Sequence, residues 1–299
     1  MMSDVKSLLP IESTDGFVLD QAVSRAIGED LMGEYAFAEP YPHIVIDNFL
    51  PAEMAEQLLA HFPEDAKAHD KTYQKGYGGT HKRQILPYDC DVYMRDAFAF
   101  FNSAAMLQFL EGVTNIRGLL PDPYFSGGGL HETSNGGLLG IHADFRVNES
   151  LQTLRRVNLL IYLNKDWQDA YGGKLELWDR EMTAMVKSVS PVFNRCVIFN
   201  TDEDSFHGHP DPLTLPDGVS RRSIALYYYT AMPISNDSGE SRHTLYVARP
   251  HDSEQVKADV RKLAKKREKR AKKLFQAHEQ QSMKQKLASI KSRLLSLFK

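Results

Sequence analysis

The sequence predicts a mostly β protein with flanking helices, built on a two-sheet antiparallel barrel of the jelly-roll kind (a double-stranded β-helix). Three observations indicate this fold. From Tyr124 onward, short apolar runs alternate with turn residues at fairly even spacing, with no helical period between them. Apolar residues at helical spacing occur before this region and return after Glu254. The composition, 42% hydrophobic and 25% charged over 299 residues, is that of a globular protein with a sizeable core.

The first part of the chain is expected to carry helices and one strand. These are a short helix around 19–27, an entry strand over 41–50 and a helix that Pro51 opens and that ends near Phe62. Residues 65–88 are polar and rich in glycine, which predicts a long loop. Asp91 is a suitable N-cap for a helix that runs to about Val113 and packs on a sheet.

Five strands are then expected, each apolar and bounded by turn residues. They are Leu138–Asp144, Arg156–Leu163, Lys174–Trp178, Arg195–Asn200 and Arg222–Thr230. The breakers between them are Gly136-Gly137, Asn164–Asp166, Gly172-Gly173 and Pro210–Gly218. A barrel of such strands has an interior wide enough for a metal ion and a small ligand.

The charge is distributed unevenly. From Arg249 to the end the formal charge is +11, whereas the remainder carries −14. We therefore expect three regions: an N-terminal segment (1–40), a central domain (41–248, with its barrel over about 120–232) and a basic helical extension (249–299). In the extension, Lys262–Lys273 is almost continuously basic, and an apolar stripe follows at Leu287, Ile290, Leu294 and Leu297.

Cysteine usage and the absence of targeting patterns indicate a reducing compartment. The two cysteines, Cys90 and Cys196, do not make a disulfide framework, and Cys196 lies in an apolar run typical of a buried free thiol. No secretory signal is evident at the start of the chain, and no apolar segment is long enough to span a bilayer. A cytoplasmic location is the resulting expectation.

His142 and Asp144 form the first half of a candidate metal site. They are two residues apart on an expected strand, so both side chains emerge from one face and can converge on an ion. A buried carboxylate without a partner would be costly, and a cation resolves that cost. One carboxylate with two imidazoles is the facial set that binds non-haem Fe(II) and leaves coordination positions open.

His207 is the expected second imidazole, because it follows the apolar run 196–199. His209 has the same parity and is the alternative for this position. Arg221 begins a strongly strand-like segment, and a guanidinium facing inward there requires an anionic partner such as a dicarboxylate. Arg222, on the opposite face, is expected to meet solvent.

Several segments in register resemble the 2-oxoglutarate- and Fe(II)-dependent oxygenases, in particular the prolyl 4-hydroxylase-like branch that includes the oxygen-sensing enzymes. Residues 157–167 followed by Gly172-Gly173-Lys174-Leu175 are similar to that branch's strand, turn and Gly-Gly strand. Residues 189–195 resemble its approach to the distal iron ligand, and Arg221–Ile224 its cosubstrate-arginine strand. The resemblance covers roughly 41–232 and is specific from about Gly136.

The resemblance implies a role for each matching residue. His142, Asp144 and His207 would be the iron ligands and catalytic residues, and Arg221 would hold the distal carboxylate of 2-oxoglutarate as a bidentate pair. Tyr162 resembles the tyrosine that supports this carboxylate, and Asn158, on the same strand face, is included with the cosubstrate contacts.

His131 departs from the family pattern, because the oxygen sensors have a tyrosine near this place. His131 could donate a similar hydrogen bond to the cosubstrate, contact substrate or be an exposed loop residue. The segment after His207 is longer than in the oxygen sensors, so 209–212 forms either a lip over the site or a stiff turn.

The implied activity is hydroxylation of an unactivated C–H bond, with decarboxylation of 2-oxoglutarate to succinate and CO₂. The cofactors would be Fe(II), 2-oxoglutarate and O₂, with ascorbate as a possible reductant. Because Asp144 is intact, hydroxylation is favoured over the halogenation of relatives that have a small residue there. A prolyl residue in a protein or peptide is the expected substrate, and a free amino acid, another small molecule or a glycan is the alternative.

Two other classes of function compete with this reading. One is a catalytically silent barrel that binds a metal or dicarboxylate, and the other is a cupin-like hydrolase or isomerase that would not need Arg221. The basic extension could bind nucleic acid, an anionic membrane or an acidic partner, or form an oligomer. A solvated helix that packs its apolar stripe on the body or on another copy of the chain is the favoured interpretation, because no aromatic residues interleave with its lysines.

Overall fold

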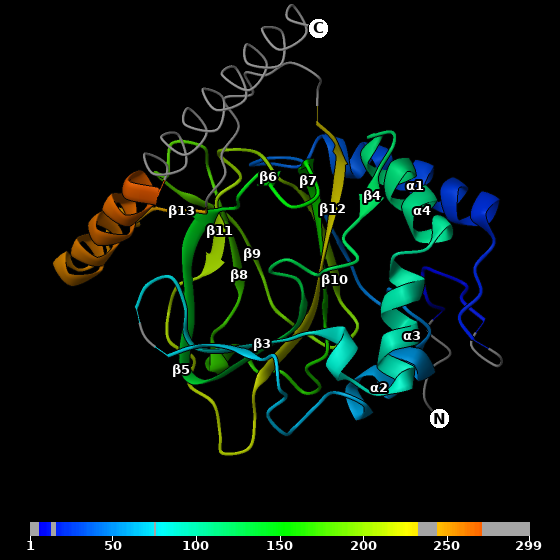
Figure 1. Cartoon of the computed structure of the whole chain (residues 1–299), viewed down its shortest axis with the longest axis horizontal. Helices are drawn as coiled ribbons and strands as arrows, with labels where there is room; N and C mark the ends of the chain where they lie inside the picture. The colour runs from blue at the N-terminus through cyan, green and yellow to red at the C-terminus, as the bar shows by residue number, and fades with distance from the viewer. Residues whose placement is uncertain (1–5, 13–15, 75, 233–243, 271–299) are drawn as a thin grey trace, which may run out of the picture.

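The computed structural model describes residues 6–12, 16–74, 76–232 and 244–270. Within them, thirteen strands form one hydrogen-bonded sheet that folds over into a nearly closed antiparallel barrel, with helices packed outside it (Figure 1). The fold class predicted from the sequence, a jelly roll with flanking helices, is confirmed. The predicted division at residues 40 and 248 stays a prediction.

The helices and strands have the following bounds. The helices are α1 (Gln21–Ala36), α2 (Ala52–Ala60), α3 (Val92–Phe101) and α4 (Ala104–Thr114), with 3₁₀ turns at Pro87–Asp89 and Asp169–Tyr171. The strands are β1 (His43–Ile46), β2 (Lys71–Tyr73), β3 (Thr80–Ile85), β4 (Leu120–Pro121), β5 (Gly129–Ala143), β6 (Val147–Asn148), β7 (Thr153–Tyr162), β8 (Leu175–Trp178), β9 (Met185–Val189), β10 (Cys196–Asn200), β11 (His207–His209), β12 (Arg221–Ala231) and β13 (Leu245–Tyr246). Residues 254–270 are helical.

The long strand β5 joins the two sheets of the barrel. Its first part pairs with β3 and β12 in the larger sheet, which continues through β7 and β10 to β1. Its last part pairs with β11 and β13 in the smaller sheet, which continues through β8 to β9. Gly136-Gly137, expected to separate two elements, lies inside β5, and Gly136 has a φ of 73°. These glycines let the strand bend from one sheet to the other rather than end.

Side-chain alternation on the central strands separates two cores. On β7, Val157, Leu159 and Ile161 face outward, where the helices pack on the larger sheet (Figure 1). Leu160 and Tyr162, on the opposite face, pack inside the barrel with apolar residues of β8 and β10. The barrel interior therefore receives every second residue of each strand, and this is where the polar site is built.

The two middle helices differ from the single helix expected over 91–113. Asp91 caps α3 as predicted, accepting a hydrogen bond from Met94 N at 3.0 Å. The chain then breaks at Asn102, and Ser103 caps α4 by accepting from Met106 N. Capping residues inside an apolar stretch allow a new helix to start. The first helix is also longer than the predicted 19–27, since α1 begins after its cap at Asp20 and continues to Ala36.

The expected loop over 65–88 is wrong in part, because it contains the hairpin β2–β3, which adds to β5. Its strands are polar because β3 forms part of the barrel wall. There Lys82 lines the interior, and the buried side chain of Gln84 donates a hydrogen bond to a backbone carbonyl. These strands are therefore held by hydrogen bonds and lack the alternation of apolar and polar residues by which a strand is recognised in a sequence.

Three smaller expectations have clear outcomes. Cys196 is a buried free thiol, as predicted, and Cys90 is buried and free as well. The extension is helical over 254–270, on the side of the barrel away from α1 and α4 (Figure 1), whereas the apolar stripe beyond Leu287 lies outside the described residues. Among the described helices, none has the length and apolar character that crossing a membrane requires.

Candidate metal and cosubstrate site

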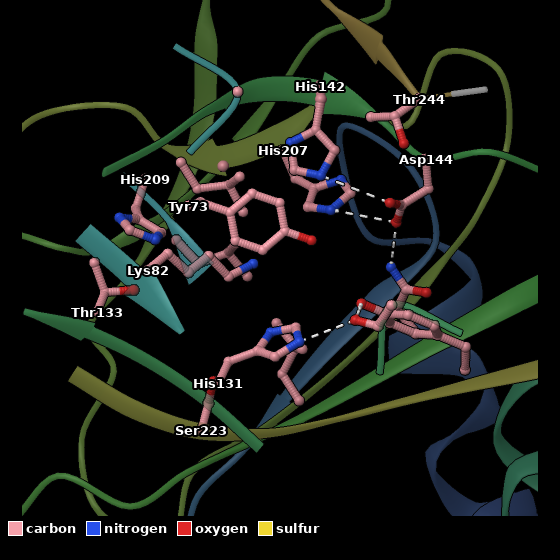
Figure 2. Close-up of a pocket in the computed structure, with 18 of the residues that line it drawn as sticks. Tyr73, Lys82, His131, Thr133, His142, Asp144, His207, His209, Ser223 and Thr244 are labelled. Atoms are coloured by element: carbon pink, nitrogen blue, oxygen red, sulfur yellow. Dashed lines mark hydrogen bonds and ion pairs between the residues drawn. The ribbon is translucent and has the colours of Figure 1, made fainter. Parts of the chain in front are cut away.

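His142, Asp144 and His207 meet inside the barrel. His142 is near the end of β5, Asp144 follows that strand, and His207 begins β11, directly opposite His142 in the register. One possible ligand atom from each residue lies within 4.8 Å of the others, and all three residues are buried. The Nε2 atom of His142 is 3.6 Å from Asp144 Oδ1, and that of His207 is 3.5 Å from Oδ2 (Figure 2). This arrangement fits one small cation.

The backbone fixes which nitrogen of each histidine faces the site. The Nδ1 atom of His142 lies 2.9 Å from Gly140 O, and that of His207 lies 2.9 Å from Ser205 O. A carbonyl oxygen can only accept a hydrogen bond, so each Nδ1 carries the hydrogen and each Nε2 offers its lone pair to the site. Burial, with the nearby His142, lowers the pKa of His207 to about 4, which keeps its ring neutral and able to ligate.

Asp144 is held by Arg155 and Asn158. Arg155 Nη2 lies 2.8 Å from Asp144 Oδ2, and Asn158 Nδ2 donates to the same oxygen at 2.8 Å. Arg155 Nε also donates to Asn158 Oδ1. Burial alone would raise the pKa of Asp144, but the adjacent guanidinium and imidazoles outweigh it and hold this pKa well below its usual range. The carboxylate is therefore ionised and oriented.

Arg155 was not found from the sequence, although it is among the most buried side chains in the protein. A β-bulge explains this, because Tyr228 pairs with Val157 and Tyr229 with Arg155, which leaves Arg156 as an extra residue. Without the bulge, Arg155 would share the outward face of Val157. No pattern in the amino-acid types marks this shift. Asn158, in turn, has both amide atoms engaged here, and its predicted cosubstrate contact stays a prediction.

Arg221 faces the barrel interior and is 6% exposed. Its Nε donates to Gly173 O at 2.8 Å, and its Nη2 donates to Tyr162 Oη at 3.3 Å. No acidic side chain of the described residues pairs with it. A side chain at Gly173 would place Cβ 2.5 Å from Leu213 Cδ2 and 3.1 Å from Arg221 Cδ, so glycine there leaves room for the guanidinium. Arg221 and Tyr162 thus present donors to an anion.

Arg222 lies on the other face, but the expectation that it meets solvent is wrong. Its Nε donates to Ser220 Oγ at 3.0 Å and lies 3.3 Å from Glu132 Oε1. The guanidinium also covers the ring of Phe62 at 4.9 Å. The reason is that β12 is covered by other elements on both faces.

A cavity of about 240 Å³ is lined by His142, Asp144 and His207 (Figure 2) and also by Arg221. Besides the residues above, its walls include Tyr73, Lys82, His131, Thr133, His209, Ser223, Tyr227 and Tyr246. Lys82 and Tyr246 were not predicted. Lys82 lay in the region read as a loop, and Tyr246 lies on the short strand β13, with its ring centroid 5.4 Å from that of His142.

The structure also places the two histidines whose roles were open. His131 lies on β5 and lines the cavity, with Nε2 2.9 Å from Gly127 O, so the reading as an exposed loop residue is wrong. His209 is buried but is not part of the cluster; Figure 2 shows it beside Thr133 and Lys82. Asp211, in the expected lip, forms an ion pair with Arg249 at 2.6 Å. The segment after β11 is thereby tied to the chain that leads into the extension.

Comparison with known families identifies one match. The family model described as the 2OG-Fe(II) oxygenase superfamily matches residues 128–229, a span that contains the cluster, Tyr162 and Arg221. No curated protein sequence matches the chain.

Several solved structures are similar to part of this chain. A prolyl hydroxylase from Trichoplax adhaerens, solved with a hypoxia inducible factor peptide fragment, is 18% identical with a TM-score of 0.47, over 69% of this chain and 90% of that one. A prolyl-4-hydroxylase from Pseudomonas putida is 19% identical with a TM-score of 0.46, over 68% and 98%. HygX from Streptomyces hygroscopicus, solved with nickel, 2-oxoglutarate and hygromycin B, is 16% identical with a TM-score of 0.42, over 67% and 92%. At this distance a shared substrate does not follow.

Proposed function

We propose that the protein is a 2-oxoglutarate- and Fe(II)-dependent dioxygenase that hydroxylates an unactivated C–H bond. The match of residues 128–229 to the family model of the 2OG-Fe(II) oxygenase superfamily supports this proposal. One observation carries this proposal. The ligand atoms of His142, Asp144 and His207 lie within 4.8 Å of one another, in the same cavity as Arg221, a buried cation without an acidic partner among the described residues.

The donor set fits a ferrous ion. The two imidazoles and the carboxylate would hold the metal ion and would leave room beside it for the cosubstrate and dioxygen. Iron would supply the oxygen-activation chemistry, and the protein's part is to orient the ligands and the substrate. The backbone carbonyls behind each imidazole and the Arg155–Asn158 pair behind Asp144 give this orientation.

The cosubstrate would be held by Arg221 and Tyr162. The guanidinium and the hydroxyl lie 3.3 Å apart and can donate together to one distal carboxylate. His131 lines the same cavity, and its role as a further cosubstrate contact, like that of Asn158, remains part of the proposal. Ascorbate, as a reductant for the iron, is a prediction that rests on the family resemblance alone.

The substrate proposal has a favoured class and an alternative class. A prolyl residue of a protein or peptide is the proposed target, and a small molecule or glycan is the alternative. The intact carboxylate of Asp144 supports hydroxylation. A silent barrel that only binds metal and dicarboxylate is the competing function, and it predicts binding without turnover.

The test is iron-dependent release of succinate from 2-oxoglutarate, measured with a panel of peptides and metabolites. We expect succinate from the wild type in the presence of a substrate, and loss of 2-oxoglutarate use in Arg221→Met. Arg222→Met is the matched control, since it removes the neighbouring guanidinium from the outer face of the same strand. Normal 2-oxoglutarate use by Arg221→Met would contradict the proposal.

A further inference from the structure

Lys82 is a cation of the cavity that the proposed oxygenase chemistry does not use. It stands on β3 and lines the cavity with the cluster and Arg221 (Figure 2). Its ammonium lies near the ring of Tyr73, whose centroid is 5.8 Å from Nζ. In the described part of the chain, no carboxylate or carbonyl accepts a hydrogen bond from this ammonium. A cation in such a position needs an anion from outside the protein.

The register of the larger sheet sets Lys82 apart from Arg221. Thr133 of β5 pairs with Lys82 on one side and with Arg221 on the other. The two cations therefore start from strands on either side of β5, with backbones about 10 Å apart at the usual strand spacing. Arg221 donates hydrogen bonds to Gly173 O and Tyr162 Oη, on the side away from β3. Lys82, in contrast, lies beside Thr133 and His209 (Figure 2). Two separate donor groups result.

His209 adds a second polar group without a partner on the side of Lys82. It is 4% exposed, and its Nδ1 atom has no hydrogen-bond partner among the residues that the structure describes. A buried nitrogen of this kind is costly unless a ligand or water satisfies it. The ammonium itself is destabilised, since burial and the charge of Arg221 lower the pKa of Lys82 to about 8.

The charges of the cavity give a third argument. Asp144 is the one acidic side chain among the described residues that line it, and Arg155 neutralises this carboxylate. A ferrous ion and the 2-oxoglutarate dianion cancel one another. Arg221 and Lys82 then leave a formal surplus of two positive charges, even with metal and cosubstrate bound. A neutral prolyl ring would not reduce this surplus.

We infer that the primary substrate presents an anionic oxygen group, a carboxylate or a phosphate, to Lys82, with Thr133 and His209 beside it. This inference rests on the proposed function and names the chemical class of its substrate. Of the two substrate classes proposed above, it therefore favours the small-molecule alternative, as a free acid or a phosphate ester, over a neutral peptide segment. Lys82 is a binding and specificity residue in this account, and it is separate from the cosubstrate donors Arg221 and Tyr162.

The experiment is a calorimetric titration of the full chain loaded with Mn(II) and 2-oxoglutarate. The probes are inorganic phosphate and, separately, acetate. The wild type should bind at least one of them, and the one that binds identifies the anion as a phosphate or a carboxylate. Lys82→Met should weaken this binding roughly 10- to 100-fold, the effect of losing one charged hydrogen bond. Its affinity for 2-oxoglutarate should stay within about threefold, since no donor to that ligand is removed.

Controls separate the possible outcomes. Lys71→Met, on the exposed strand β2 of the same hairpin, should bind the probes as the wild type does. Lys82→Gln tests the same prediction if the Met variant is unstable. Binding of neither probe by the loaded wild type, or unchanged binding by both Lys82 variants, would overturn the inference. So would a tenfold loss of 2-oxoglutarate affinity in these variants, which would make Lys82 a cosubstrate residue. Failure of the wild type to take up Mn(II) and 2-oxoglutarate contradicts the proposed function itself, and is seen before any probe is added.

Discussion

Replacing Arg155 by Met should strongly destabilise the metal-free protein. The guanidinium is 1% exposed and lies 2.8 Å from Asp144 Oδ2, where it is the cation that neutralises this carboxylate. Met is similar in length and leaves no large void. The variant therefore keeps a buried, ionised carboxylate whose remaining side-chain donor is Asn158.

The size of the effect follows from the burial of this pair. Removing one partner of a buried ion pair costs about 3–5 kcal/mol, because the other charge stays buried and uncompensated. The guanidinium carbon also lies 3.3 Å from the ring centroid of Tyr227, and losing this contact costs about 0.5–2 kcal/mol more. A loss of this size should lower the midpoint of thermal unfolding by on the order of 10 °C.

Denaturation followed by circular dichroism, with a chelator present and then with excess Mn(II), measures this effect. Because the bound ion supplies the positive charge that Arg155 provides, we expect metal to recover at least half of the lost stability. Arg156→Met is the matched control: it removes the next guanidinium along the chain, which forms no ion pair with the residues that the structure describes. A loss below about 1 kcal/mol without metal, or an equal loss in Arg156→Met, would refute the reasoning.

Three further perturbations test the site and its supports. Lys82→Met should be more stable than the wild type by about 1–2 kcal/mol at pH 7, after allowance for the partial exposure of Lys82. The ammonium of Lys82 loses its proton near pH 8 in the folded protein but only near pH 10.5 in the unfolded chain. The difference in stability between the variant and the wild type should therefore shrink as pH rises from 8 to 10.5, which denaturation at each pH would measure. Asn158→Ala should weaken metal binding roughly tenfold or more, measured by titration with Mn(II), because the carboxylate ligand loses a donor that orients it. Gly173→Ala should destabilise by about 1–3 kcal/mol, because its Cβ would lie 2.5 Å from Leu213 Cδ2, and should also raise the dissociation constant for 2-oxoglutarate. Gly218→Ala is the control, because Gly218 has a similar φ but nothing lies near its Cβ, so this variant has the backbone strain without the steric clash. An equal loss of stability in the two variants would count against the clash as the cause.

The sequence predicts the central strands and the metal cluster for a physical reason. On β7, β10 and β12 each strand is rich in β-branched and aromatic residues and is bounded by turn residues, so its position in the barrel is visible in the chain. His142 and Asp144 share a face because strands have a period of two. That His207 rather than His209 joins the cluster follows from pairing with β5, which the chain does not specify locally.

What the sequence does not predict depends on contacts between distant segments. The hairpin β2–β3 is polar because it closes a ligand cavity, so its alternation is not one of hydrophobicity. The inward position of Arg155 needs a bulge in β7 that only the pairing with β12 reveals. Likewise, Arg222 is covered by Phe62 and Glu132, which come from elsewhere in the chain. Cations of the site are therefore harder to foresee than its metal ligands.

Anaerobic addition of 2-oxoglutarate to the iron-loaded protein, followed by visible absorption, tests the central claim most directly. Chelation of a ferrous ion by the cosubstrate gives a charge-transfer band. We predict a band that saturates at one equivalent of each per chain and is absent from His207→Ala. Iron binding that survives this substitution, or saturation with 2-oxoglutarate without such a band, would contradict the assignment of the site.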